Sequence, residues 1–188
     1  MKFWGAWLSS LIFMLWPQVD LFFDSTMSRH MVLQPIIFTF LGLLIGKKIR
    51  FDFGVFNVFG ISGLIFFISN YLFWMLPRSL DLTLINEVVD KSCHICLVLG
   101  GFILAKSVAR MAFFVRAAFG INFLAMFSAL GLFYSVYEEQ ACASYSLIQQ
   151  KEAGIDFLAV TFPLWLAHLI WIFTKNYDVQ NAKLSKVF

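Results

Sequence analysis

Charged residues are scarce in this chain, and their scarcity argues against an ordinary soluble domain. Only 13% of the 188 residues are Asp, Glu, Lys or Arg, against about a quarter in typical soluble proteins. No run of Lys or Arg forms a basic patch, so we expect no nucleic-acid partner. Cysteine is rare as well. Three cysteines are an odd number, which does not make a closed disulfide framework.

Catalytic motifs are also missing. The sequence contains no Ser/His/Asp set, no phosphate-binding loop and no pair of carboxylates placed within an apolar run. Paired broken helices in matching halves, the usual sequence pointer to a transporter, are missing too. These absences favour an assembly factor or accessory subunit over a hydrolase or a transferase.

Apolar residues are correspondingly abundant. They make up 61% of the chain, with 24 Phe, 6 Trp and a mean hydropathy of +0.82. A bilayer accommodates such a composition because lipid solvates apolar side chains, and about 20 apolar residues cross its hydrocarbon core as a helix. We therefore predict an all-α polytopic membrane helix bundle, a single domain over residues 1–188 with about six transmembrane helices. The predicted spans lie near residues 3–23, 28–46, 53–76, 92–109, 111–137 and 156–174.

The first predicted span is interpreted as a retained helix. A signal peptide would end in a small-x-small cleavage site, whereas this segment ends in Trp16-Pro17-Gln18-Val19-Asp20. With six spans, ten of the fourteen basic residues fall on one side of the membrane and nine of the eleven acidic residues on the other. The positive-inside rule then predicts that both termini are cytoplasmic. We expect a bacterial or archaeal cytoplasmic membrane, with membrane lipid around the bundle.

Histidine is the ionisable residue that most needs an explanation inside these spans, because ionisable groups at membrane depth are costly. His30 begins the second predicted span and His94 begins the fourth. Both spans run in the same direction, so the two imidazoles are predicted to lie at one depth under the outer surface, where they can form one site. His168 lies twelve residues into the sixth span, towards the cytoplasmic side, and is not assigned to that site.

Soft donor atoms surround the two outer histidines in sequence. Met27, His30 and Met31 share a helical face, and so do Cys93 and Cys96. Thioether, thiolate and imidazole together suit Cu(I), so the candidate metal ligands are Met27, His30, Met31, Cys93, His94 and Cys96. Two alternatives stay open. His30 and His94 can instead hold a haem b axially, or all of these residues can serve ordinary packing and interhelical hydrogen bonding.

Four short strings follow one another in order between residues 25 and 174: RHMVL at 29–33, WMLPRSLD at 74–81, CHICLVLGG at 93–101 and QQKEAG at 149–154. Together they resemble segments of the CtaG family of cytochrome c oxidase assembly factors, of the caa3-type branch. The resemblance implies a role in inserting copper into a membrane oxidase, with other subunits of that complex as partners.

The chain departs from the family pattern at four positions. Thr26, Met75 and Asp90 stand where the family has histidines, and Cys93 stands where it has a glutamate. A metal site carried over from the family would therefore have fewer histidines and more sulfur. The alternative functions are a haem b-binding or copper-binding small subunit of a larger membrane redox complex, and a purely structural subunit of such a complex.

Overall fold

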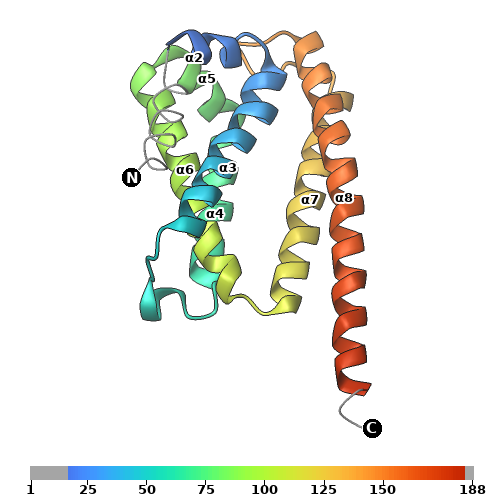
Figure 1. Ribbon diagram of the computed structural model, residues 1–188. Helices are drawn as coiled ribbons and strands as arrows, with labels where there is room; N and C mark the ends of the chain where they lie inside the picture. The colour runs from blue at the N-terminus through green and yellow to red at the C-terminus, as the bar shows by residue number, and fades with distance from the viewer. Residues whose placement is uncertain (1–16, 185–188) are drawn as a thin grey trace.

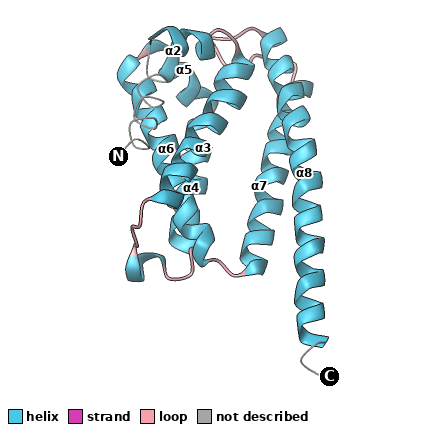
Figure 2. Ribbon diagram, in the orientation of Figure 1, coloured by secondary structure: helices cyan, strands magenta, loops and turns pink. Residues whose placement is uncertain are grey.

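The structure is a computed structural model that describes residues 17–184. This part of the chain is helical and contains no strand (Figure 2). Its elements, in chain order, are α2 (Pro17–Asp24), the π-helical turn η1 (Arg29–Leu33), α3 (Gln34–Lys48), the 3-10 turn η2 (Gly54–Asn57), α4 (Ile61–Trp74), α5 (Pro77–Ile85), α6 (Glu87–Arg110), α7 (Phe113–Val136) and α8 (Leu147–Leu184).

Four of these helices are long and apolar enough to cross a membrane, which identifies the chain as a membrane protein. They are Arg29–Lys48, Glu87–Arg110, Phe113–Val136 and Leu147–Asn176, and they correspond to the second, fourth, fifth and sixth predicted spans. The third is represented by the shorter apolar helix α4. The predicted first span lies mostly in residues 1–16, outside the described residues, and only its end appears, as α2. The all-helical bundle is thus confirmed, while the count of six spans stays a prediction.

The third predicted span, 53–76, contains the shorter helix α4, because residues at both ends of the span limit the helix. Gly60 has a φ of 73°, a left-handed conformation that glycine adopts readily, and the helix starts directly after it. At the other end Pro77 begins α5, and the residue before a proline is disfavoured in a helix. The segment before Gly60 is held by Arg110, which donates to the carbonyl oxygens of Gly54 at 2.8 Å and Asn57 at 2.9 Å.

Glycine brings α3 and α6 together along their length. A Cβ atom on Gly42 would collide with the carbonyl oxygen of Val98, and one on Gly101 would collide with the carbonyl oxygen of Thr39. Each helix therefore places a glycine against the backbone of the other, which is how membrane helices approach closely. This α3–α6 seam fixes the relative height of the two helices.

Aromatic rings join α4 to α7 in a different way. Phe67 and Tyr71 of α4 pack against Phe123 of α7 with ring centroids 5.5 and 5.6 Å apart, and Tyr71 reaches Phe127 at 5.4 Å. Phe127 in turn contacts Phe157 of α8 at 5.6 Å. Large side chains thus connect the α7–α8 pair to the rest of the bundle, whereas small ones join α3 to α6.

Helix direction places most of the acidic residues at one end of the molecule and most of the basic residues at the other. Helices α3, α6 and α8 run one way and α4 and α7 the other (Figure 1). The acidic end carries Asp20, Asp24, Asp81, Glu87, Asp90 and Glu152, and the basic end carries Lys47, Lys48, Arg50, Lys106 and Arg110. The acidic end holds the starts of η1–α3 and α6, and therefore both His30 and His94.

Candidate functional site

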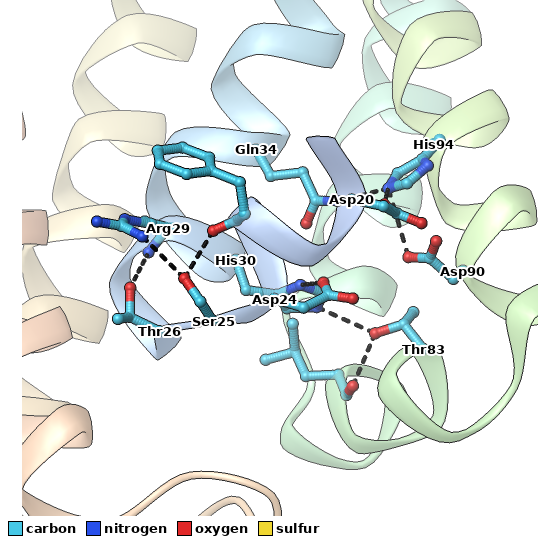
Figure 3. Close-up of polar contacts among 12 residues, drawn as sticks. Asp20, Asp24, Ser25, Thr26, Arg29, His30, Gln34, Thr83, Asp90 and His94 are labelled. Carbon is cyan, nitrogen blue, oxygen red and sulfur yellow. Dashed lines mark hydrogen bonds and ion pairs between the residues drawn. The ribbon is translucent and has the colours of Figure 1, made fainter. Parts of the chain in front are cut away.

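Helix α2 lies across the acidic end and presents two carboxylates to the bundle (Figures 1 and 3). Asp20 and Asp24 are one turn apart and share a face of this helix. Oδ1 of Asp24 lies 2.9 Å from Nδ1 of His30, and Oδ1 of Asp20 lies 3.7 Å from Nε2 of His94. Each predicted histidine therefore faces its own carboxylate from α2.

His30 is held by protein partners on both ring nitrogens. It lies in the π-helical turn just before Pro35, where a widened turn accommodates a residue that lacks an N–H. Besides the contact of Nδ1 with Asp24, its Nε2 donates to Oγ1 of Thr83 at 3.0 Å, because that hydroxyl uses its own proton on the carbonyl oxygen of Leu80 at 2.7 Å. A ring bonded on both sides has no nitrogen left for a metal or a haem iron in this arrangement.

His94 is placed by the start of α6. Asn86 caps this helix by accepting from the backbone N–H groups of Val88 and Val89, so the helix begins at residue 87, earlier than the predicted start at 92. One turn separates Asp90 from His94, and Oδ1 of Asp90 lies 3.3 Å from Nε2 of His94. Phe38 of α3 stacks on the imidazole with ring centroids 4.3 Å apart.

Three ligand atoms converge at this point. One atom each from Asp20, Asp90 and His94 lies within 4.8 Å of the other two, and Figure 3 shows the three side chains turned towards one another. Asp90 and His94 are buried, with side chains 6% and 2% exposed. Oδ1 of Asp20 is also buried and accepts no hydrogen bond from the protein. Burial raises the pKa of Asp20, helped by the negative charge of Asp24 and opposed by a hydrogen bond to Asp90.

The ligand chemistry of this cluster is nitrogen and oxygen. Two carboxylates and an imidazole suit divalent first-row metal ions such as Zn²⁺, Fe²⁺ and Cu²⁺. The amide nitrogen of Gln34 also contacts Nε2 of His94, so an ion bound there would take the place of this hydrogen bond. The cluster can therefore hold a proton between its acids or exchange it for a metal ion.

The predicted sulfur donors lie in or against the hydrophobic core. Met27 and Met31 are fully buried in the hydrophobic core. Cys93 and Cys96 are partly buried and pack against the same core. Across the described residues, no cysteine belongs to a group of three His, Cys, Asp or Glu ligands. Binding of Cu(I) by the sulfur set stays a prediction.

Two members of the cluster, Asp20 and Asp90, are absent from the ligand set predicted from the sequence, although Asp90 stands where the CtaG family has a histidine. Asp90 was counted among the acids of an outer loop, because the fourth span was predicted to begin at residue 92. The signal that would have found it is the spacing Asp90-x-x-x-His94, which places both side chains on one face of a helix. His168, set aside from the sequence, bonds to the carbonyl oxygen of Ala117 on α7 at 3.1 Å.

Comparison with known proteins finds no match for this chain. No family model matches the chain, and neither does any curated protein or solved structure with which it was compared. The site therefore has to be interpreted from its own geometry.

Proposed function

We propose that this membrane protein binds a divalent transition-metal ion through Asp20, Asp90 and His94 at the acidic end of its bundle. The observation that carries the proposal is the convergence of three ligand atoms within 4.8 Å, two of them on side chains that are almost completely buried. A buried group of this kind needs compensation for its charge, and a bound cation supplies it.

Electrostatics favours a doubly charged ion. Two neighbouring carboxylates repel each other when both are ionised, and Asp24 adds a third negative charge nearby. A divalent ion cancels the charge of the pair and leaves the neutral imidazole as the third ligand. Open coordination positions would be filled by water, which suits an ion that has to be taken up and passed on. Among the first-row ions, Cu²⁺ has the highest intrinsic affinity for such a site.

The resemblance to CtaG assembly factors extends the proposal from binding to delivery. By the positive-inside rule the acidic end faces outwards, where copper reaching a membrane oxidase on the outer surface would meet it first. We accordingly place the acidic end outside and the basic end in the cytoplasm of a bacterium or archaeon. A strain that lacks the protein should then assemble an oxidase with less copper than the parent strain.

Metal analysis of paired variants tests the proposal. Purified protein is loaded with Zn²⁺ or Cu²⁺, desalted and measured for bound metal. Asp90→Asn and Asp20→Asn should each lower the affinity by at least about tenfold, the scale of losing one ligand. The sulfur variants Cys93→Ser and Met31→Leu should bind as the wild type does. Loss of metal from the sulfur variants but not from the carboxylate variants would contradict the Asp20–Asp90–His94 site and support the Cu(I) set instead.

The haem b alternative is checked on the same preparation. Haem ligated by two imidazoles has a strong Soret absorption, so its appearance in protein purified with haem available would oppose the proposal. His30→Ala should leave metal binding much less affected than His94→Ala, because His30 bonds to Asp24 and Thr83 instead of the cluster.

A further inference from the structure

Arg116, near the basic end, carries a charge for which the described protein supplies no partner. It is the only charged residue of α7 and lies in the first turn of this candidate span. Its Nε is buried without a hydrogen-bond partner. Within the part of the chain that the structure describes, its guanidinium group makes no hydrogen bond or ion pair. A charge at membrane depth is costly unless it is compensated, so we looked for a ligand from outside the chain.

The neighbouring cations differ from Arg116 because protein groups or water compensate them. Arg110 pairs with Asp52, and Lys106 donates to the carbonyl oxygen of Ile49. Arg50, also at the basic end, is exposed, whereas Arg116 is half-buried. Water and dissolved ions reach Arg50 much more freely than Arg116. Among the cations that the structure describes at this end, Arg116 is therefore the one that most needs an anionic ligand.

An apolar pocket of about 600 Å³ begins one turn further into the bundle. Phe119, Phe123 and Phe127 line it, and they follow Arg116 at i+3, i+7 and i+11, which places all four residues on one face of α7. Along α7 the pocket extends from Phe119 to Phe127, about 12 Å at 1.5 Å per residue. Arg116 therefore lies on the pocket-lining face, beyond the end of the pocket that is nearest the basic end.

The pocket is open to the lipid between α3 and α8. Phe40 of α3 is 57% exposed at its rim, and Leu164 of α8 is 48% exposed. A hydrocarbon chain can enter there from the side. The length of the pocket along α7 is close to the half-thickness of a hydrocarbon core of about 30 Å, which is the depth that the acyl chains of one leaflet fill. Size and access therefore suit an acyl chain from the leaflet at the basic end.

We propose that Arg116 binds the phosphate group of an anionic phospholipid, with phosphatidylglycerol as the model ligand, while one acyl chain of that lipid occupies the pocket. A guanidinium group donates from a planar fork that matches two phosphate oxygens. The acyl chain follows Phe119 and Phe123 towards the middle of the bilayer. This site lies at the opposite end of the bundle from Asp20, Asp90 and His94, so it does not depend on the proposed metal.

Charge selects an anionic head over a zwitterionic one. Phosphatidylcholine would bring a positively charged choline group to an end of the molecule that is already basic, where like charges repel. Phosphatidylglycerol brings a net negative charge instead. Basic pockets between membrane helices are known sites for anionic lipid heads. The basic residues at this end, besides Arg116, include Lys47, Lys48, Arg50, Lys106 and Arg110.

Matched charge variants test the head group. Binding of palmitoyl-oleoyl phosphatidylglycerol and of the matching phosphatidylcholine to the purified protein in detergent is titrated by native mass spectrometry. The wild type should bind phosphatidylglycerol at least tenfold more tightly. Arg116→Gln should weaken phosphatidylglycerol binding by about tenfold, the scale of one charge-assisted hydrogen bond, and Arg116→Lys by less than about threefold. Arg50→Gln removes the same charge from an exposed position and should change it by less than about twofold.

A pocket-filling variant tests the place of the acyl chain and leaves Arg116 intact. Leu164→Trp narrows the pocket at its rim and should weaken the binding of phosphatidylglycerol by about tenfold. Leu166→Trp is the matched control, because Leu166 is 49% exposed on the same helix and does not line the pocket. It should change the binding by less than about twofold.

The outcomes separate this inference from its alternatives. Equal affinity of the wild type for the two lipids, or an equal loss in Arg116→Gln and Arg50→Gln, overturns the site. Oleate that displaces phosphatidylglycerol at lower concentration, dependent on Arg116, assigns the pocket to a fatty acid and overturns the phospholipid. A dimer that Arg116→Gln dissociates overturns it in favour of an interface between two copies. Zn²⁺ binding is measured on the same samples, and its absence would contradict only the metal site.

Discussion

At the scale of single residues, the spacing of acids on α2 decides which histidine each one meets. Asp24 pairs with His30, and Asp20 joins Asp90 around His94. The two histidines therefore have different roles although they begin parallel helices at the same end of the bundle. The first connects α2 to Thr83 of α5, and the second has one nitrogen at the cluster and another, Nδ1, that is buried without a hydrogen-bond partner.

Asp20 predicts how the stability of the metal-free protein depends on pH. Its pKa is raised in the fold, chiefly by burial. Its contribution to the free energy of unfolding is therefore full below the ordinary pKa of 3.8 and is lost as the pH rises through the raised value. The melting temperature with a chelator present should fall as the pH increases over this window. Asp20→Asn should flatten this fall.

Added Zn²⁺ should stabilise the protein more at higher pH, which is opposite in sign to the pH dependence of the metal-free protein. A metal ion competes with the proton on Asp20, so the stabilisation by Zn²⁺ should grow as the pH rises through the raised pKa of Asp20. The measurement is the shift in melting temperature between Zn²⁺ and chelator at each pH. A shift that is constant over this range would argue against a carboxylate from α2 as a ligand.

Residue identity predicted one of the three ligands of this site, His94, and the neighbouring His30. His30 and His94 stand out in sequence because histidine is rare here and both lie at the starts of apolar runs. Asp20 and Asp90 do not stand out, because acids near span ends are commonly solvated. Their burial depends on α2 folding back across the bundle, a contact between segments about 70 residues apart. No local pattern in the sequence specifies that contact.

At the scale of elements, helix ends account for the differences between predicted and observed boundaries. Hydropathy marks the apolar part of α6 but not its first turn, which contains Glu87 and Asp90. The cap at Asn86 starts the helix before the apolar run, and this extra turn is what brings Asp90 onto the face of His94. Capping and glycine conformation are thus the local signals that hydropathy alone misses.

The α3–α6 seam gives a prediction about packing. Gly101→Ala places a methyl group on the backbone of Thr39, which cannot move as a flexible side chain does. It should lower the free energy of unfolding in detergent by about 1 to 3 kcal/mol, as overpacking does. Ala109→Leu, at an exposed position on the same helix, should change it by less than about 0.5 kcal/mol. Equal stability of the two variants would mean that α3 and α6 pack less closely at Gly101 than the structure shows.

At the scale of the whole molecule, charge at the two ends sets the orientation that the proposed function needs. Cysteine labelling in intact cells tests it, in a background where Cys93, Cys96 and Cys142 are replaced by Ser. Ser144→Cys, in the exposed loop at the acidic end, should react with a membrane-impermeant maleimide. Val55→Cys, 81% exposed at the basic end, should react only after the cells are opened. The opposite pattern would place the metal site in the cytoplasm.

The all-helical class and the places of the four long helices were predictable because apolar runs are local in sequence, while the count of six spans stays a prediction. How the helices pair was not predictable in the same way. Gly42 and Gly101 permit close contacts, but their partners follow from the three-dimensional arrangement of α3 and α6. The same holds for the aromatic contacts between α4 and α7, which many other phenylalanines of this chain are equally suited to make.

The reciprocal glycines of the α3–α6 seam have a consequence for how this sequence can vary. Gly42 and Gly101 each lie against a backbone carbonyl, so even the smallest side chain is excluded at both positions. The ligand positions are more permissive, since several residue types can hold a metal ion or a proton. In a library of random single substitutions, nearly every replacement of Gly42 or Gly101 should therefore prevent folding. A few replacements of Asp20 and Asp90 should be tolerated. As substitutions accumulate, the ligands of the site should therefore change before the relative height of α3 and α6 does.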